Sequence, residues 1–270
     1  MKGRIFSVVG GMFLLTVCSK GSQSNVQAAP SSPALEPAPA AAGSSEVSAA
    51  GGTITGKVKF TGTAPRNPRI DMTEEAVCQA KYTTPPTEEN VVAGAANSLA
   101  NVFVYVKAGV PAGQTFPAPT ATVVLDQNGC RYHPHVFGMM VGQPFEILNS
   151  DATSHNIKAI AKQNRGFNIS QPNAGMKRVL TTSSDPRTFT APEVMVNLEC
   201  NVHGWMHAYV GVRPDPFFAV TGPDGSFSIK GLPPGTYTIE AWHEKFGTQT
   251  ATVTIAGTES KTANFTFAAH

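Results

Sequence analysis

Short runs in which apolar and polar residues alternate recur along the chain from about residue 53 onward. Alternation with a period of two predicts strands that bury one face, and β-branched and aromatic residues strengthen that prediction. Residues with turn chemistry, above all Gly, Pro, Asn and Asp, separate the runs. We expect strands at 53–60, 101–107, 121–126, 136–141, 143–148, 165–170, 177–181, 193–198 and 208–212. Many short strands joined by frequent turns predict an all-β protein built as a sandwich.

Two parts of the chain depart from this pattern. Residues 65–98 are irregular, with a short helical turn expected near Glu75. Residues 219–241 contain a Gly-bearing turn, a strand, a Pro-Pro-Gly turn and another strand, and further strands are expected at 250–255 and 262–267. About fifty residues is short for an independent sandwich, so this tail either borrows the strand at 53–60 or packs onto the preceding domain.

The N-terminal pattern predicts export. A basic start is followed by the apolar run 5–17, which is too short to span a bilayer and fits a signal-peptide core. Leu15-Thr16-Val17-Cys18 resembles a bacterial lipobox, which implies cleavage before Cys18, its lipidation, and a place in the periplasm or cell envelope. The alternative is ordinary cleavage near Ala29. Residues 1–18 are therefore the expected leader, and the Ser/Pro/Ala-rich residues 19–50 a disordered linker.

Composition narrows the functional classes. The 270 residues include 25 Gly and 21 Pro, 41% are hydrophobic, and only 14% are charged. A net charge of +2 without a Lys/Arg cluster argues against nucleic-acid binding. The sequence shows no nucleophile–base set, no paired carboxylates and no phosphate-binding Gly loop, so we expect no enzyme activity.

The four cysteines are Cys18, Cys78, Cys130 and Cys200. In an oxidising compartment, a stable pair is expected to form a disulfide. If Cys18 carries lipid, a bond between Cys78 and Cys130 leaves Cys200 free, and a free exported thiol calls for an explanation such as metal ligation. The alternative is that Cys200 pairs with one of the other two and no metal binds.

Cys200, His203 and Met206 form a Cys-x2-His-x2-Met motif between two expected strands. A thiolate, two imidazoles and a distant thioether are the ligands of an electron-transfer copper site. The motif supplies three of these groups, and His155 is the best candidate for the second imidazole. Strands of a sandwich end on a common rim, which could bring His155 and Cys200 together.

These residues resemble the cupredoxins, the small blue-copper sandwiches, and the short motif is most similar to that of the amicyanins. The resemblance implies a Greek-key sandwich over 51–215 with one copper ion held by His155, Cys200, His203 and Met206, and with Asn156 tying the two ligand loops together. Residues 219–241 resemble the carboxypeptidase regulatory-like, transthyretin-like sandwiches, so 216–270 is the expected second module. That fold family is non-catalytic and is sometimes associated with carbohydrate binding.

The resulting hypothesis is a membrane-tethered carrier of single electrons between redox proteins such as a cytochrome or an oxidoreductase. The alternative is a non-redox binding or structural module whose site is vestigial or holds zinc through His155, Cys200, His203 and His207. His133 and His135 could bind a second metal on one face of an extended segment, although ordinary strand-end histidines are favoured. Packing is also favoured for Met139, Met140, Tyr237, Trp242 and His243.

Overall fold

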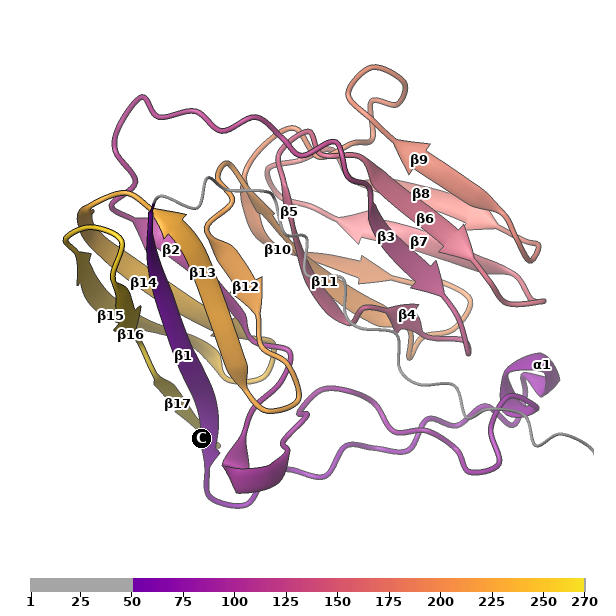
Figure 1. Ribbon diagram of the computed structural model, residues 1–270. Coiled ribbons are helices and arrows are strands. Elements are labelled where there is room, and N and C mark those ends of the chain that lie inside the picture. The colour runs from indigo at the N-terminus through magenta and orange to yellow at the C-terminus, as the bar shows by residue number, and fades with distance from the viewer. Residues whose placement is uncertain (1–50, 270) are drawn as a thin grey trace, which may run out of the picture. The chain divides into compact units, whose positions relative to one another are not determined.

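A computed structural model of the chain describes residues 51–269. The expected leader at 1–18, with Cys18, and the expected linker at 19–50 lie outside these residues. The described part is all-β, with four sheets, one short α-helix and one 3-10 helix (Figure 1). None of its helices has the length and apolar character needed to cross a membrane.

The first sandwich comprises residues 123–213. Its strands are β3 (Val123–Gln127), β4 (Tyr132–His133), β5 (Val136–Met140), β6 (Phe145–Asn149), β7 (His155–Ile160), β8 (Phe167–Gln171), β9 (Lys177–Leu180), β10 (Glu193–Glu199) and β11 (His207–Arg213). They form a five-stranded sheet in the order β5-β11-β10-β7-β8 and a four-stranded sheet in the order β4-β3-β6-β9.

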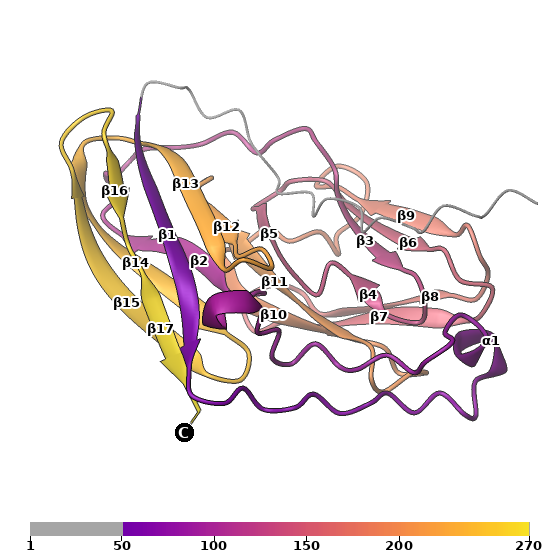
Figure 2. The same ribbon diagram turned by 60° about the horizontal axis from the view of Figure 1, so that its bottom comes forward.

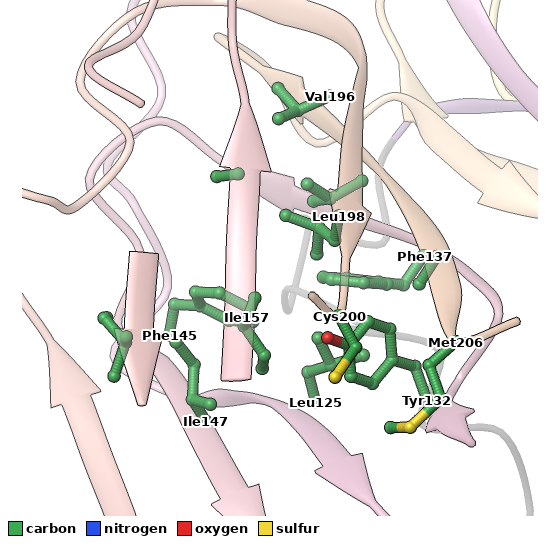
Figure 3. Close-up of a cluster of buried hydrophobic side chains, with 14 of the residues drawn as sticks. Leu125, Tyr132, Phe137, Phe145, Ile147, Ile157, Val196, Leu198, Cys200 and Met206 are labelled. Atoms are coloured by element: carbon green, nitrogen blue, oxygen red, sulfur yellow. The ribbon is translucent and has the colours of Figure 1, made fainter. Parts of the chain in front are cut away.

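One apolar core joins the two sheets of the first sandwich. Buried and less buried residues alternate along β6 and β8, as the period of two predicts. Phe145 and Ile147 of one sheet share the core with Leu198 and Val210 of the other. Figure 3 shows Val196, Leu198 and Cys200 following one another along β10 into this core. The buried face of β10 therefore ends at a thiol.

The second sandwich is built from both ends of the described chain. Its strands are β1 (Gly52–Thr61), β2 (Phe103–Ala108), β12 (Phe218–Val220), β13 (Ser226–Leu232), β14 (Gly235–His243), β15 (Gly247–Ile255), β16 (Ser260–Thr262) and β17 (Phe265–Ala268). One sheet has the order β13-β1-β16, with β17 also paired to β1, and the other has the order β12-β2-β14-β15.

The expected boundary at 215/216 therefore does not hold for β1 and β2. Strand β1 pairs with β13 on one edge and with β16 and β17 on the other, and Figures 1 and 2 both show β1 beside β13. Strand β2 lies between β12 and β14. The tail alone is too short to close a core, and β1 contributes Ile54, Val58 and Phe60 to it. Of the two alternatives, the borrowed strand is the one observed.

The irregular segment between β1 and β2 contains α1 (Ala76–Gln79), close to the helical turn expected at Glu75, and the 3-10 helix η1 (Ala95–Asn97). A disulfide joins Cys78 of α1 to Cys130, which lies shortly before β4. Cys200 is the free cysteine of the described residues, and it is buried. The disulfide thus fastens the long segment to the first sandwich and leaves the motif thiol unpaired.

Candidate metal centre

Strand pairing brings the upstream histidine to the motif. Strands β7 and β10 are antiparallel neighbours, and Glu199 is paired with Lys158. The beginning of β7 and the end of β10 therefore lie at the same edge of the sheet. His155 is the first residue of β7, rather than part of the loop in which the sequence places it, and Cys200 follows the last residue of β10.

The three nearest donor groups converge on one point. The Nδ1 atoms of His155 and His203 are 2.9 Å apart, and the Cys200 sulfur is 4.0 Å from Nδ1 of His203. One donor atom from each of the three residues lies within 4.8 Å of the others. Both imidazoles are fully buried, and Cys200 is 5% exposed. A small ion at this point would be shielded from water.

Backbone hydrogen bonds fold the motif into a tight loop. The His203 N–H donates to the Cys200 sulfur at 3.4 Å, and the Met206 N–H donates to the His203 carbonyl at 2.9 Å. The Cys200 N–H then donates to the Met206 carbonyl at 3.1 Å, which closes the loop at the base of β11. Met206 is buried, and Figure 3 shows Cys200, Tyr132 and Met206 at the same end of the core.

Asn156 connects the two ligand-bearing segments. Its Oδ1 accepts the Asn201 N–H at 2.8 Å and lies 3.4 Å from the Cys200 sulfur. Its Nδ2 donates to Oδ1 of Asn168 at 2.8 Å, which fixes the orientation of the amide. Such outer contacts hold ligands in place without binding the ion.

Asp151 is a site residue that the sequence analysis missed. Its fully buried carboxylate lies 3.0 Å from Nε2 of His155 and 2.6 Å from Nζ of Lys81. It also accepts the backbone N–H groups of Gly129 and Cys130. An ionised carboxylate only accepts hydrogen bonds, so Nε2 of His155 must donate, and Nδ1 is the nitrogen through which His155 could bind an ion after losing its proton. In the sequence, the position of Asp151 four residues before His155 is the only indication of this contact.

The charges in the cluster favour a thiolate. Burial alone would raise the pKa of Cys200, but hydrogen bonds from His155 and His203 outweigh it and lower the pKa to about 5. Burial likewise opposes ionisation of Asp151, but the bonds from His155 and Lys81 hold the pKa of its carboxyl well below the ordinary value. Burial would lower the pKa of His155, and its bonds to Asp151 and Cys200 raise it instead. The thiolate is the form of cysteine that binds metals.

The far side of His203 is covered by the disulfide segment. Its Nε2 lies 3.8 Å from the Cys78 sulfur and 3.6 Å from Oε2 of Glu75. The Trp205 ring lies 5.1 Å from the His203 ring and donates its N–H to the Cys130 carbonyl at 2.9 Å. These contacts occupy Nε2 and leave Nδ1 of His203 facing His155. The residues present therefore fit an ion with two imidazole ligands and one thiolate ligand.

The other histidines that the sequence singles out lie elsewhere. His207 does not join His155, Cys200 and His203 among the described residues, so the four ligands of the alternative zinc site are not brought together. His207 lies instead with His135 and Glu244, whereas His133 is exposed on β4. Met139 is buried in the first core and Tyr237 in the second, in accordance with their expected packing roles.

Comparisons with known proteins bear on both sandwiches. Residues 208–268 match the family model of the carboxypeptidase regulatory-like domain. No curated protein matches the chain. Among solved structures, the chain is similar to a copper-containing nitrite reductase (NirK) from Thermus scotoductus SA-01, with 20% identity over 40% of this chain and 26% of that one, and a TM-score of 0.31. The chain thus spans about a quarter of that protein's length.

Two further solved structures, each matched over nearly its whole length, are also similar. A mutant of amicyanin in its Cu(I) form is 19% identical over 41% of this chain and 98% of its own length, with a TM-score of 0.28. A purple cupredoxin from Nitrosopumilus maritimus is 21% identical over 34% and 98%, with a TM-score of 0.27. At these TM-scores the likenesses carry no argument about function, which therefore depends on the geometry of the site.

Proposed function

We propose that the chain is a type 1 copper protein that carries single electrons between redox partners. The observation that carries the proposal is the convergence of a buried, readily ionised thiol with two imidazole Nδ1 atoms. His155, Cys200 and His203 would hold the copper ion, and the thioether of Met206 would be a weak fourth ligand. A copper ion held by these residues would supply a one-electron couple between Cu(I) and Cu(II).

The chain's own contribution is a buried set of ligands held in place by neighbouring side chains. Asp151 and Asn156 orient His155 and Cys200 from behind, and the disulfide segment covers His203. Rigid sheets carry both ligand segments, so the ligand positions change little between oxidation states. The apolar surroundings of the sulfur and the distant thioether would set the reduction potential. In this proposal the chain catalyses no reaction, and its partners are a cytochrome or another redox protein.

Addition of Cu(II) to the purified chain tests the proposal. We expect an intense charge-transfer band at ~600 nm that is absent in Cys200→Ser, because copper–thiolate bonding gives such sites their colour. His155→Gln should weaken or abolish the band, whereas Gln substituted for the exposed His133 should leave it unchanged. A colourless protein that retains zinc would favour the non-redox alternative.

The proposal includes export and attachment to the envelope through a lipid on Cys18. This part depends on the sequence motif alone, because Cys18 lies outside the described residues. Mass analysis of the mature N-terminus distinguishes a lipidated Cys18 from cleavage near Ala29.

A further inference from the structure

A second group of side chains with potential metal-donor atoms lies beside the first but shares no residue with it. His135, His207 and Glu244 each offer one donor atom within 4.8 Å of the others. Nε2 of His135 is 2.5 Å from Oε1 of Glu244, and Nε2 of His207 is 3.6 Å from Oε2. His135 precedes β5, His207 begins β11, and Glu244 follows β14, so the second cluster, as we call these three residues, involves both sandwiches.

Backbone carbonyls fix which nitrogen of each ring faces Glu244. Nδ1 of His135 lies 3.2 Å from the His207 carbonyl, and Nδ1 of His207 lies 3.1 Å from the Trp205 carbonyl. A carbonyl only accepts hydrogen bonds, so both Nδ1 atoms must carry the proton. In the neutral rings, both Nε2 lone pairs then point toward the carboxylate. A histidine that binds a metal commonly has this arrangement, with its other N–H held by a carbonyl.

Two lone pairs and a carboxylate cannot face one another without a positive charge between them. Glu244 is nearly buried, with 7% of its side chain exposed, and its side chain therefore has little water to screen it. A carboxylate buried between two imidazoles therefore needs either protons on the imidazoles or a cation to balance its charge.

We propose that the second cluster binds a divalent transition-metal ion, of which Zn²⁺ is the test case, through His135 Nε2, His207 Nε2 and Glu244. Two imidazoles and one carboxylate form a ligand set that zinc accepts, at distances of about 2.0–2.2 Å. An open pocket of about 460 Å³ borders His207 and Glu244 and is also lined by Asn197, Glu199 and Tyr209. Water or a small ligand in this pocket would complete the coordination.

The proposal is independent of copper at Cys200. Zinc in the second cluster would fasten the turn after β14 to the base of β11, next to the proposed copper ligand Met206. It would thereby couple the stability of the second sandwich to the position of the motif loop. The alternative is a permanent ion pair in which protonated imidazoles balance Glu244 and no metal binds.

The experiment counts zinc in the full chain. Cys200→Ser removes the thiolate of the first cluster, and zinc binding is then measured by calorimetry at pH 7.5 with and without Glu244→Gln. We expect the Cys200→Ser chain to bind one zinc ion. Glu244→Gln should lower the affinity for that ion by more than the roughly 10–100-fold that loss of an outer contact costs. Glu199→Gln, in the same pocket but outside the cluster, is the matched control and should bind zinc normally.

Two further measurements distinguish the outcomes. Anomalous scattering at the zinc edge, from crystals of the unsubstituted chain, should show an ion bonded to His135 Nε2 and His207 Nε2. Equal zinc affinity in the Cys200→Ser protein with and without Glu244→Gln would overturn the proposal, as would crystals without an ion at this position. Copper binding in Glu244→Gln is measured separately by the ~600 nm band, so failure of the copper proposal and failure of this one are distinguishable.

Discussion

The loop from Cys200 to His207 contributes to two clusters that use a carboxylate in opposite ways. In the first, the Cys200 sulfur faces two Nδ1 atoms, and Asp151 lies behind His155 as an outer partner. In the second, Glu244 itself lies between two Nε2 atoms, and backbone carbonyls take the outer positions. A central thiolate is a soft ligand and a central carboxylate a hard one. The two clusters are therefore expected to prefer different metal ions.

The two clusters also differ in what assembles them. The first needs only the first sandwich and the disulfide segment, since His155 and Cys200 lie on paired strands. The second needs Glu244 from the second sandwich, and residues of both sandwiches also share a small apolar cluster of Phe103, Tyr105 and Val136. Disruption of the second sandwich should therefore abolish the second cluster before the first.

Of the substitutions considered, loss of the disulfide should lower the free energy of unfolding the most. Cys78 and Cys130 are 52 residues apart, and closing a loop of that length contributes ~4 kcal/mol by constraining the unfolded chain. Replacing both with Ser should lower the free energy of unfolding by that amount in urea titrations, and should weaken copper binding because Cys78 contacts His203. The control is Cys200→Ser, which leaves the disulfide intact. A loss of under ~1 kcal/mol would contradict the expectation.

Asp151→Asn tests the outer carboxylate of the first cluster. The amide lacks the charge that faces Lys81 and accepts the His155 N–H less strongly. Copper affinity, measured by competition with a chelator, should fall by roughly 10–100-fold, while zinc affinity of the second cluster stays unchanged. Asp126→Asn is the matched control, since among the described residues the Asp126 carboxylate accepts just the hydroxyl of Ser150, at 2.7 Å. Equal copper affinity in both variants would show that Asp151 is not a positioning residue.

Glu193 supports the strands of the first cluster at their far ends. Its carboxylate accepts the N–H groups of Lys162, Gln163 and Asn164 after β7. Burial would raise the pKa of Glu193, but these bonds outweigh it and lower the pKa below 4.5. The ionised group therefore stabilises the fold above that value, and the contribution is lost as the pH falls through the folded-state pKa.

Glu193→Gln should consequently destabilise the chain by ~1–2 kcal/mol at pH 7, and the difference should shrink as the pH falls through the folded-state pKa of Glu193. Urea unfolding at several pH values measures it, with the exposed Glu74→Gln as the control. Metal binding in both clusters should be unchanged at pH 7. A difference that does not depend on pH would contradict the assigned cause.

Trp205→Phe should have the smallest effect on the stability of the chain. The substitution keeps the ring beside His203 but removes the N–H that donates to the Cys130 carbonyl at 2.9 Å. Loss of one such bond costs ~1 kcal/mol of stability. Copper and zinc stoichiometries should stay the same, because the Trp205 carbonyl that holds His207 belongs to the backbone. Loss of zinc in this variant would indicate that the ring itself positions the second cluster.

Alternation of apolar and polar residues was sufficient to predict most strands of both sandwiches, since each of those strands buries one face. It does not predict β7, which lies between β10 and β8 and is buried on both faces over His155–Ile157, and which therefore lacks alternation. Strands β4, β12 and β16 are only two or three residues long, too short to show a period.

Local spacing in the sequence was sufficient to identify the donor groups of the motif. The spacing of Cys200, His203 and Met206 is local, so one tight loop carries these side chains wherever the loop is placed. His155 and Asn156 could also be identified, because the resemblance to a known ligand pattern supplied what spacing alone lacked. Asp151 was missed, since a carboxylate in a polar turn gives no sign that it will be buried against an imidazole.

Which distant residues meet depends on the three-dimensional fold. Backbone pairing assigned β1 and β2 to the second sandwich, and the fold placed Glu244 between His135 and His207. The disulfide left Cys200 free because the chain path puts Cys78 next to Cys130. Contacts between residues far apart in the sequence depend on strand order and on the paths of the long connections, which hydrophobic periodicity does not encode. The relative positions of side chains within one turn of the backbone, in contrast, are fixed by local geometry.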